Sequence, residues 1–106
     1  MKAIIVEDSP ETRHRLLGLI AQIDGIDVVG LADDAETGML LAKAHRPTLA
    51  IVGLHLDDGR GVDVIQTIKQ AHPLSDVVAL ADHTSAEHRI DGLFEKMTSS
   101  RLHSRT

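Results

Sequence analysis

The chain contains four short apolar runs, each separated from the next by a longer mixed segment. The first residues of these runs are Ala3, Ile26, Leu49 and Asp76. An interval of about 25 residues is long enough for a strand, a helix of about three turns and two loops. The runs are almost continuously aliphatic, which is typical of strands buried on both faces of a parallel sheet. The pattern therefore predicts parallel strands connected by helices.

The segment after the first run carries the signals of a helix start and a helix stop. Ser9 followed by Pro10 predicts an N-cap and the first helical position. Asp24 and Gly25 predict the end of the helix, because glycine readily adopts the left-handed conformation found after a last turn. The predicted apolar face, with the spacing i, i+4, i+7, consists of Leu16, Ile20 and Ile23.

Two later segments are also predicted to be helical. Asp33 and Glu36 form a capping-box pattern at the start of the second helix, which ends before Pro47. The third helix ends before Pro73. The apolar positions are Met39, Leu40 and Leu41 in the second helix and Val62, Ile65 and Ile68 in the third. Repeated strand–helix units predict an α/β fold, a doubly wound parallel sheet with helices on both faces and right-handed crossovers.

The last part of the chain departs from this pattern. Thr84 and Glu87 predict a helix of only about two turns. Leu93–Glu95 then predicts a short fifth strand. The segment that follows, residues 97–106, is polar and cannot supply an amphipathic face. We therefore expect one domain over residues 1–96, followed by a disordered tail.

Composition narrows the class of protein. Of the 106 residues, 42% are hydrophobic and 25% are charged, which is ordinary for a globular domain. The absence of Cys excludes disulfides and thiolate metal sites and suits a cytoplasmic location. No apolar run approaches the roughly 20 residues of a membrane span, so we expect no membrane contact. The net charge of −5 argues against nucleic acid as a partner.

If the first and third strands are neighbours in the sheet, two carboxylates, a glycine and a lysine share one crevice. In open α/β sheets, ligands bind outside the carboxyl ends of the strands, where the strand order reverses. Glu7 and Asp8 follow the first strand, Gly53 ends the third, and Lys96 follows the fifth. Adjacent carboxylates at a strand end are typical of a Mg²⁺ site. Acids at this place also interact favourably with the dipole of the helix that follows them. The residues alone therefore leave open whether the pair binds Mg²⁺ or only stabilises the start of the helix.

Three segments resemble the receiver domain of two-component response regulators. They read "VEDSPETR" after the first strand, "RPTLAIVGLHLDDGRGVDVIQTIKQAHP" in the middle and "DGLFEK" near the end. The resemblance spans Met1 to Lys96 and implies a flavodoxin-like fold with strand order 2-1-3-4-5 and a Mg²⁺ site at the acidic pair. It also implies an aspartate at the end of the third strand that accepts a phosphoryl group from a histidine kinase.

This resemblance holds at some functional positions and fails at others. Glu7 and Asp8 match the acidic pair, and Lys96 matches a lysine that holds the phosphoryl oxygens. Three positions are changed: Gly53 at the acceptor aspartate, Ala81 at a Ser or Thr that holds phosphoryl oxygens, and Leu93 at a switch aromatic. Without a carboxylate at position 53, no oxygen there can attack phosphorus and a metal ligand is lost. We therefore interpret the chain as a degenerate receiver, or pseudo-receiver, and not as an enzyme.

Other acids leave an alternative function open. Asp57 and Asp58 lie in the turn beyond the third strand and could act as weak phosphoacceptors. Glu7 and Asp8 could instead support Mg²⁺-dependent phosphoryl chemistry, with the backbone carbonyl of His55 completing a weak Mg²⁺ site. Apart from such weak Mg²⁺ binding we expect no cofactor. A decayed fragment with little specific function is a third hypothesis.

The resemblance also implies elements that the sequence lacks. Between Ala81 and Lys96 the chain is short by about seven residues, or two helical turns. We therefore expect a shortened fourth helix and no fifth helix, which leaves apolar sheet surface uncovered. This favours a homodimer formed by residues 81–96 and the first-helix face, residues 13–23. The sequence thus predicts a stand-alone, non-phosphorylatable domain that acts by contact with signalling proteins in a bacterial two-component phosphorelay.

Overall fold

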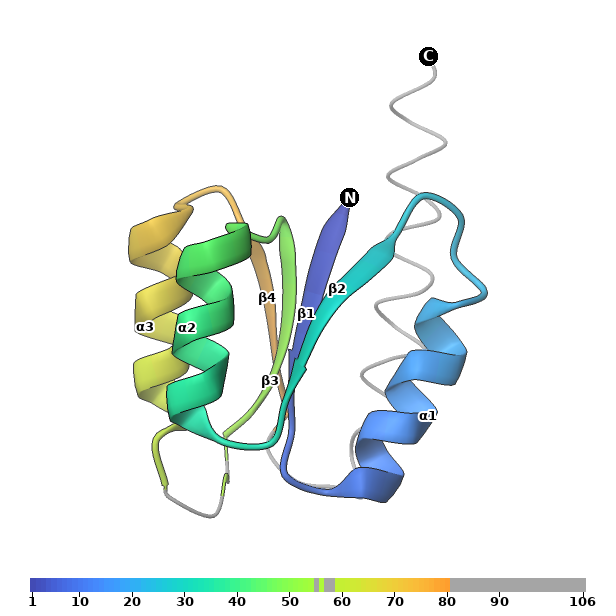
Figure 1. Cartoon of the computed structure of the whole chain (residues 1–106), viewed down its shortest axis with the longest axis horizontal. Helices are drawn as coiled ribbons and strands as arrows, with labels where there is room; N and C mark the ends of the chain where they lie inside the picture. Colours follow the sequence, from blue (N-terminus) through green and yellow to red (C-terminus); the bar gives the residue numbers. More distant parts are fainter. Residues whose placement is uncertain (55, 57–58, 81–106) are drawn as a thin grey trace.

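The computed structural model of the protein describes residues 1–54, 56 and 59–80, and in this part of the chain the strands form one parallel sheet. The strand order is β2-β1-β3-β4, so β1 and β3 are the central strands (Figure 1). The strands are β1 (Lys2–Val6), β2 (Asp27–Ala32), β3 (Leu49–Gly53) and β4 (Asp76–Leu80). The predicted order 2-1-3-4 is confirmed for the strands described.

Helices cover both faces of this sheet. In the described part of the chain they are α1 (Pro10–Ile20), α2 (Ala35–His45) and α3 (Gly61–Ala71). Figure 1 shows α2 and α3 side by side on one face and α1 on the other. The predicted doubly wound arrangement is therefore confirmed.

Each face of the sheet has its own apolar core, because successive side chains of a strand point to opposite faces. The core shared with α2 and α3 contains Ile4, Val6, Ala35, Ala42, Ala50, Val52, Val64 and Ile68. The core shared with α1 contains Ile5, Leu16, Ile20, Ile51 and Leu80. Burial on both sides explains why the central strands are continuously aliphatic over residues 3–6 and 49–52.

Helix α1 begins where the sequence predicts and ends earlier. Ser9 is the N-cap, whose hydroxyl accepts a hydrogen bond from the backbone N–H of Thr12 at 3.3 Å, and Pro10 is the first helical residue. The prediction that Ile23 belongs to the helix is wrong, because α1 ends at Ile20. The N–H of Ile23 donates to the carbonyl of Ile20 at 2.9 Å, a three-residue step that tightens the chain and ends the α-helix.

The N-cap predicted for α2 is wrong by one residue. The helix begins at Ala35, and Asp34 rather than Asp33 is its N-cap. The carboxylate of Asp34 accepts a hydrogen bond from the backbone N–H of Thr37 at 2.7 Å. A capping side chain must directly precede the first helical residue to reach this N–H. Because β2 continues to Ala32, only the second of the two acids stands at that boundary.

Helix α2 ends before Pro47, as predicted, and its last turn closes on a left-handed residue. The C-cap Arg46 has φ 45° and ψ 61°, a region that favours glycine. Its N–H donates to the carbonyl of Ala42 at 2.9 Å, and its Nε donates to the carbonyl of Ala71 at 3.1 Å. The side-chain bond joins the ends of α2 and α3 and offsets the cost of the left-handed backbone.

The buried face of α3 matches the prediction at Ile68, which is fully buried, and at Ile65, which packs against the core, and differs from it at Val62. Val62 is 56% exposed, whereas Val64 and Ile68 are fully buried. The reason lies at Gly61, where an added Cβ would stand 2.8 Å from the Cα of Leu54. The first turn of α3 therefore lies directly on the chain that leaves β3, and this close approach turns Gly61, Val64 and Ile68 toward the sheet.

The remaining predictions about the fold lie outside the described residues. They concern the shortened fourth helix, the fifth strand, the missing fifth helix and the tail at residues 97–106. Within residues 1–54, 56 and 59–80, no helix is long and apolar enough to cross a membrane.

Candidate functional site

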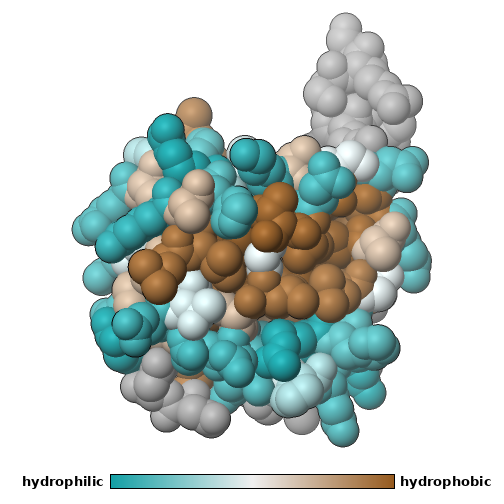
Figure 2. Space-filling model, viewed as in Figure 1, coloured by the Kyte–Doolittle hydropathy of each residue, from teal (hydrophilic) through white to brown (hydrophobic). Residues whose placement is uncertain are grey.

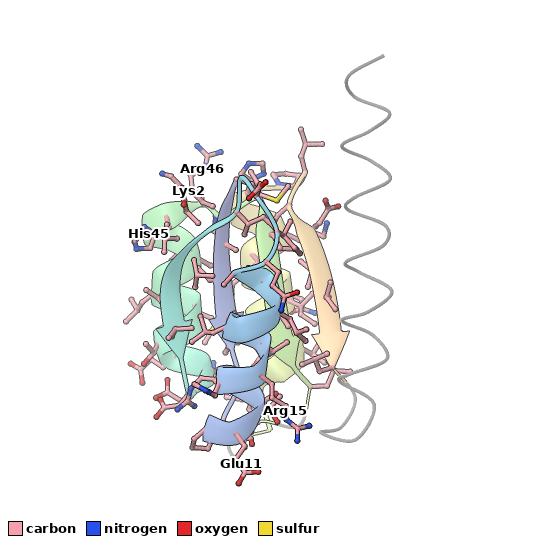
Figure 3. All side chains as sticks on the ribbon, turned by 90° about the vertical axis from the view of Figure 1, so that its right-hand side faces the viewer. Lys2, Glu11, Arg15, His45 and Arg46 are labelled. Atoms are coloured by element: carbon pink, nitrogen blue, oxygen red, sulfur yellow. The ribbon has the colours of Figure 1, made fainter. Side chains whose placement is uncertain are left out.

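The carboxyl ends of β1 and β3 meet where the strand order reverses. The two strands are neighbours, with Val6 opposite Val52, and the chain continues into Glu7 after β1 while β3 ends at Gly53. The start of α1, marked by Glu11 in Figure 3, lies at the same end of the sheet. This is the edge at which open α/β sheets bind ligands.

Glu7 is held inside the protein at this edge and is only 2% exposed. Its backbone N–H donates to the carbonyl of Ala32 at the end of β2 at 2.9 Å, and its carbonyl accepts a hydrogen bond from Nη1 of Arg13 at 2.7 Å. Its Oε1 accepts a hydrogen bond from the backbone N–H of Ser9 at 3.1 Å. A buried carboxylate requires a hydrogen-bond donor, and here the N–H of Ser9 at the start of α1 supplies one, while β2 and Arg13 hold the backbone of Glu7.

The carboxylate of Glu7 lies against the backbone of Gly53. A Cβ added at Gly53 would stand 2.6 Å from Oε2 of Glu7 and 3.3 Å from its Cδ. Cβ atoms in proteins do not come this close to another heavy atom, so the glycine is what makes room for the carboxylate. Glu7 therefore fills the space that a side chain at the end of β3 would take.

The described residues do not provide the ligands of a Mg²⁺ site. Asp8 follows Glu7 and is half-buried, but no group of three or more His, Cys, Asp or Glu in the described part of the chain could hold a metal. Mg²⁺ requires near-octahedral oxygen coordination. The Glu7 carboxylate is turned toward Gly53 and bonded to the N–H of Ser9. The donor set described here does not fit the ion.

The structure places only part of the predicted site. Glu7, Asp8 and Gly53 lie together at the carboxyl edge of the sheet. Six other predicted residues lie outside the described ones: His55, Asp57, Asp58, Ala81, Leu93 and Lys96.

Sequence reasoning missed two groups that position Glu7. The backbone N–H of Ser9 and the guanidinium of Arg13 both hold it from the first turn of α1. The helix-start pattern indicated where Ser9 lies, but nothing in the sequence indicates that the Arg13 side chain reaches back to Glu7.

The fold and this site define a class of protein. A parallel sheet in the order 2-1-3-4, with helices on both faces and an acid at the reversal point, is a doubly wound, flavodoxin-like domain. The family model described as the response regulator receiver domain matches residues 3–99, which is most of the chain. The chain belongs to the response regulator receiver domain family.

Curated relatives match over part of their length. The DNA-binding transcriptional activator DevR/DosR of Mycobacterium tuberculosis is 28% identical over 93 residues, which are 88% of this chain and 43% of that protein. The response regulator GacA of Pseudomonas syringae is 28% identical over 80 residues, which are 76% of this chain and 37% of that protein. The chain thus spans less than half the length of these relatives.

Solved structures share the fold. A two component transcriptional regulator AraC from Clostridium phytofermentans superposes with a TM-score of 0.71 at 19% identity, covering 99% of this chain and 98% of that one. The MaeR response regulator bound to beryllium trifluoride gives a TM-score of 0.66 at 20% identity, covering 88% of this chain and 76% of that one. At such identities the likeness concerns the fold alone.

Proposed function

We propose that this chain is a receiver-like module that accepts no phosphoryl group at position 53 and works by contact with signalling proteins in a cytoplasmic two-component pathway of a bacterium. One observation carries the proposal. Gly53 ends β3 without a carboxylate, and the Glu7 carboxylate fills the space of the absent side chain. Membership of the receiver family supports a role in signal transduction.

The chemistry of phosphoryl transfer supports the inactivity. Transfer to a protein needs an oxygen nucleophile placed in line with the donor phosphorus. By the resemblance to receivers, the residue at the end of the third strand would supply it, and here that residue is Gly53. The neighbouring carboxylate of Glu7 is an unsuitable substitute, because it is buried and accepts a hydrogen bond from the N–H of Ser9.

Surface character supports a function by protein contact. Figure 2 shows apolar residues gathered in a continuous band on the face where β2 runs between α2 and α1 in Figure 1. The large apolar side chains exposed on these elements include Leu31 of β2, at 44%, and Leu40 of α2, at 61%. Extended apolar surface of this kind usually marks a site of association. We propose that a second copy of the chain is one partner.

Mass spectrometry of the intact protein tests the proposal. After incubation with acetyl phosphate and Mg²⁺, we expect the mass to stay unchanged, because position 53 offers no carboxylate. A receiver whose third strand ends in aspartate, treated in the same mixture, serves as the positive control.

A stoichiometric phosphoryl adduct on the parent chain would contradict the proposal. Loss of that adduct in Asp57→Asn or Asp58→Asn would assign it to the turn after β3 and favour the weak phosphoacceptor. Loss in Asp8→Asn would favour Mg²⁺-dependent chemistry at the acidic pair.

A further inference from the structure

The acceptor position of this receiver has no side chain of its own, yet its space is filled. We propose that the Glu7 carboxylate is a built-in occupant of the acceptor pocket. It excludes both a phosphoryl group and a divalent cation, and it holds the ends of β1 and β3 and the start of α1 in one arrangement. This inference rests on the proposed function, because it takes Gly53 as the acceptor position.

The geometry at Gly53 identifies the occupant. The three atoms nearest to an added Cβ all belong to Glu7: Oε2 at 2.6 Å, Cδ at 3.3 Å and Oε1 at 3.6 Å. Any side chain at position 53 would therefore displace this one group. Conversely, the inward position of the carboxylate uses the space that glycine leaves at position 53. The two residues form a matched pair across neighbouring strands.

Hydrogen bonds keep the carboxylate in this place. Oε1 of Glu7 accepts the N–H of Ser9, which is the N-cap of α1, so the charge lies beside the positive end of the helix dipole. The carbonyl of Glu7 is bound by Nη1 of Arg13 from the same helix. Movement of the side chain outward would remove the acceptor of the Ser9 N–H in a part-buried site. The occupied pocket is therefore the stable arrangement.

The Glu7 carboxylate places a negative charge at the end of β3, and this charge affects which ligands can bind there. A phosphoryl group at the end of β3 would stand against a buried carboxylate, and like charges repel strongly where water is excluded. An aspartate introduced at position 53 would meet the same group. A cation is excluded for a different reason, because the oxygen that faces Gly53 is enclosed and the described residues around it supply too few further ligands.

Urea denaturation of the full chain tests the pairing through the variant Gly53→Ala. In the parent, the added methyl group clashes with Glu7, and we expect the urea midpoint to fall by roughly 0.5–1 M. In a Glu7→Ala background the space is open, and the same change should raise the midpoint, because alanine costs less backbone entropy than glycine in a strand. If Glu7→Ala does not fold, Glu7→Asp withdraws the carboxylate by about 1.5 Å and should reduce the loss.

Gly18→Ala is the matched control. It adds the same methyl group to α1, where no atom lies within 4 Å of the new Cβ. It should raise the midpoint in both backgrounds. A loss at Gly53→Ala of equal size with and without the Glu7 side chain would overturn the proposal, as would a parent that tolerates Gly53→Ala without loss.

Exclusion of the cation is tested on the parent with Mg²⁺ alone. Addition of about 10 mM Mg²⁺ should leave the amide resonances of Glu7 and Gly53 unchanged. Saturable shifts at both residues would show that the pocket opens and would overturn the inference. The proposed function fails by a separate measurement, a phosphoryl adduct on the parent chain after incubation with acetyl phosphate, so the two failures are distinguishable.

Discussion

Asp34 caps α2 as an ionised acid. The backbone N–H of Thr37 donates to its carboxylate, and this hydrogen bond lowers the pKa of Asp34 below its ordinary value of 3.8. The folded state therefore binds the proton less tightly than the unfolded state. The stability that the charged cap contributes is present above the ordinary pKa and is lost as the pH falls through the lowered pKa.

This linkage gives a prediction for the residue scale. Asp34→Asn keeps an oxygen that can cap the helix, but this oxygen cannot titrate. When the pH is lowered from about 6 to about 3, the urea midpoint of the variant should therefore fall less than the urea midpoint of the parent. Asp27→Asn, at an exposed acid of β2 outside the cap, is the control for the loss of one carboxylate. Identical acid sensitivity of the parent and Asp34→Asn would contradict the assignment of the cap.

The positions of Glu7 and Gly53 could be predicted from the sequence, but the orientation of the Glu7 side chain could not. The placement of Glu7 and Gly53 at one edge follows from the strand order that the resemblance to receivers implies. The inward turn of the Glu7 side chain does not follow from any local pattern. It depends on a vacant Cβ position on a neighbouring strand and on an N–H from the next helix. Such contacts between distant segments appear only in three dimensions.

At the scale of elements, the strands and helix starts were predictable where one strong local signal decides. Continuous aliphatic runs specify β1 and β3, and Ser9 with Pro10 specifies the start of α1. The errors occur where tertiary contacts decide. At α3, for example, the contact between Gly61 and Leu54 turns Val62 away from the sheet and Val64 toward it.

The junction of α3 with β3 gives a prediction for the element scale. A methyl group at Gly61 would meet the backbone of Leu54, at 2.8 Å from its Cα and 2.9 Å from its carbonyl oxygen. Backbone atoms cannot rotate away, so Gly61→Ala should lower the free energy of unfolding by roughly 2 kcal/mol or more. Gly18→Ala, in open space on α1, should raise it by about 0.5–1 kcal/mol. Urea denaturation measures both, and the same sign for the two variants would contradict this account.

At the scale of the whole molecule, β2 is an edge strand of the described sheet and lies within the apolar band (Figure 2). An edge strand presents backbone groups that can pair with another strand, and the same edge of a second copy offers matching groups around a two-fold axis. Leu31 and Leu40 add exposed apolar surface beside this edge. Covering a few hundred Å² at about 25 cal/mol per Å² stabilises a dimer by several kcal/mol before the cost of association.

We therefore predict that the protein sediments as a dimer at micromolar concentration and that Leu40→Lys shifts it toward monomer. The control is Val62→Lys, which places the same charge at an apolar residue of similar exposure on α3, 56% against 61% for Leu40, and should leave the dimer intact. A parent that sediments as a monomer would contradict the homodimer. A charge buried at the true interface would lower the affinity of the dimer. A dimer that resists Leu40→Lys would therefore favour the other face, which the sequence predicts to consist of residues 81–96 and 13–23.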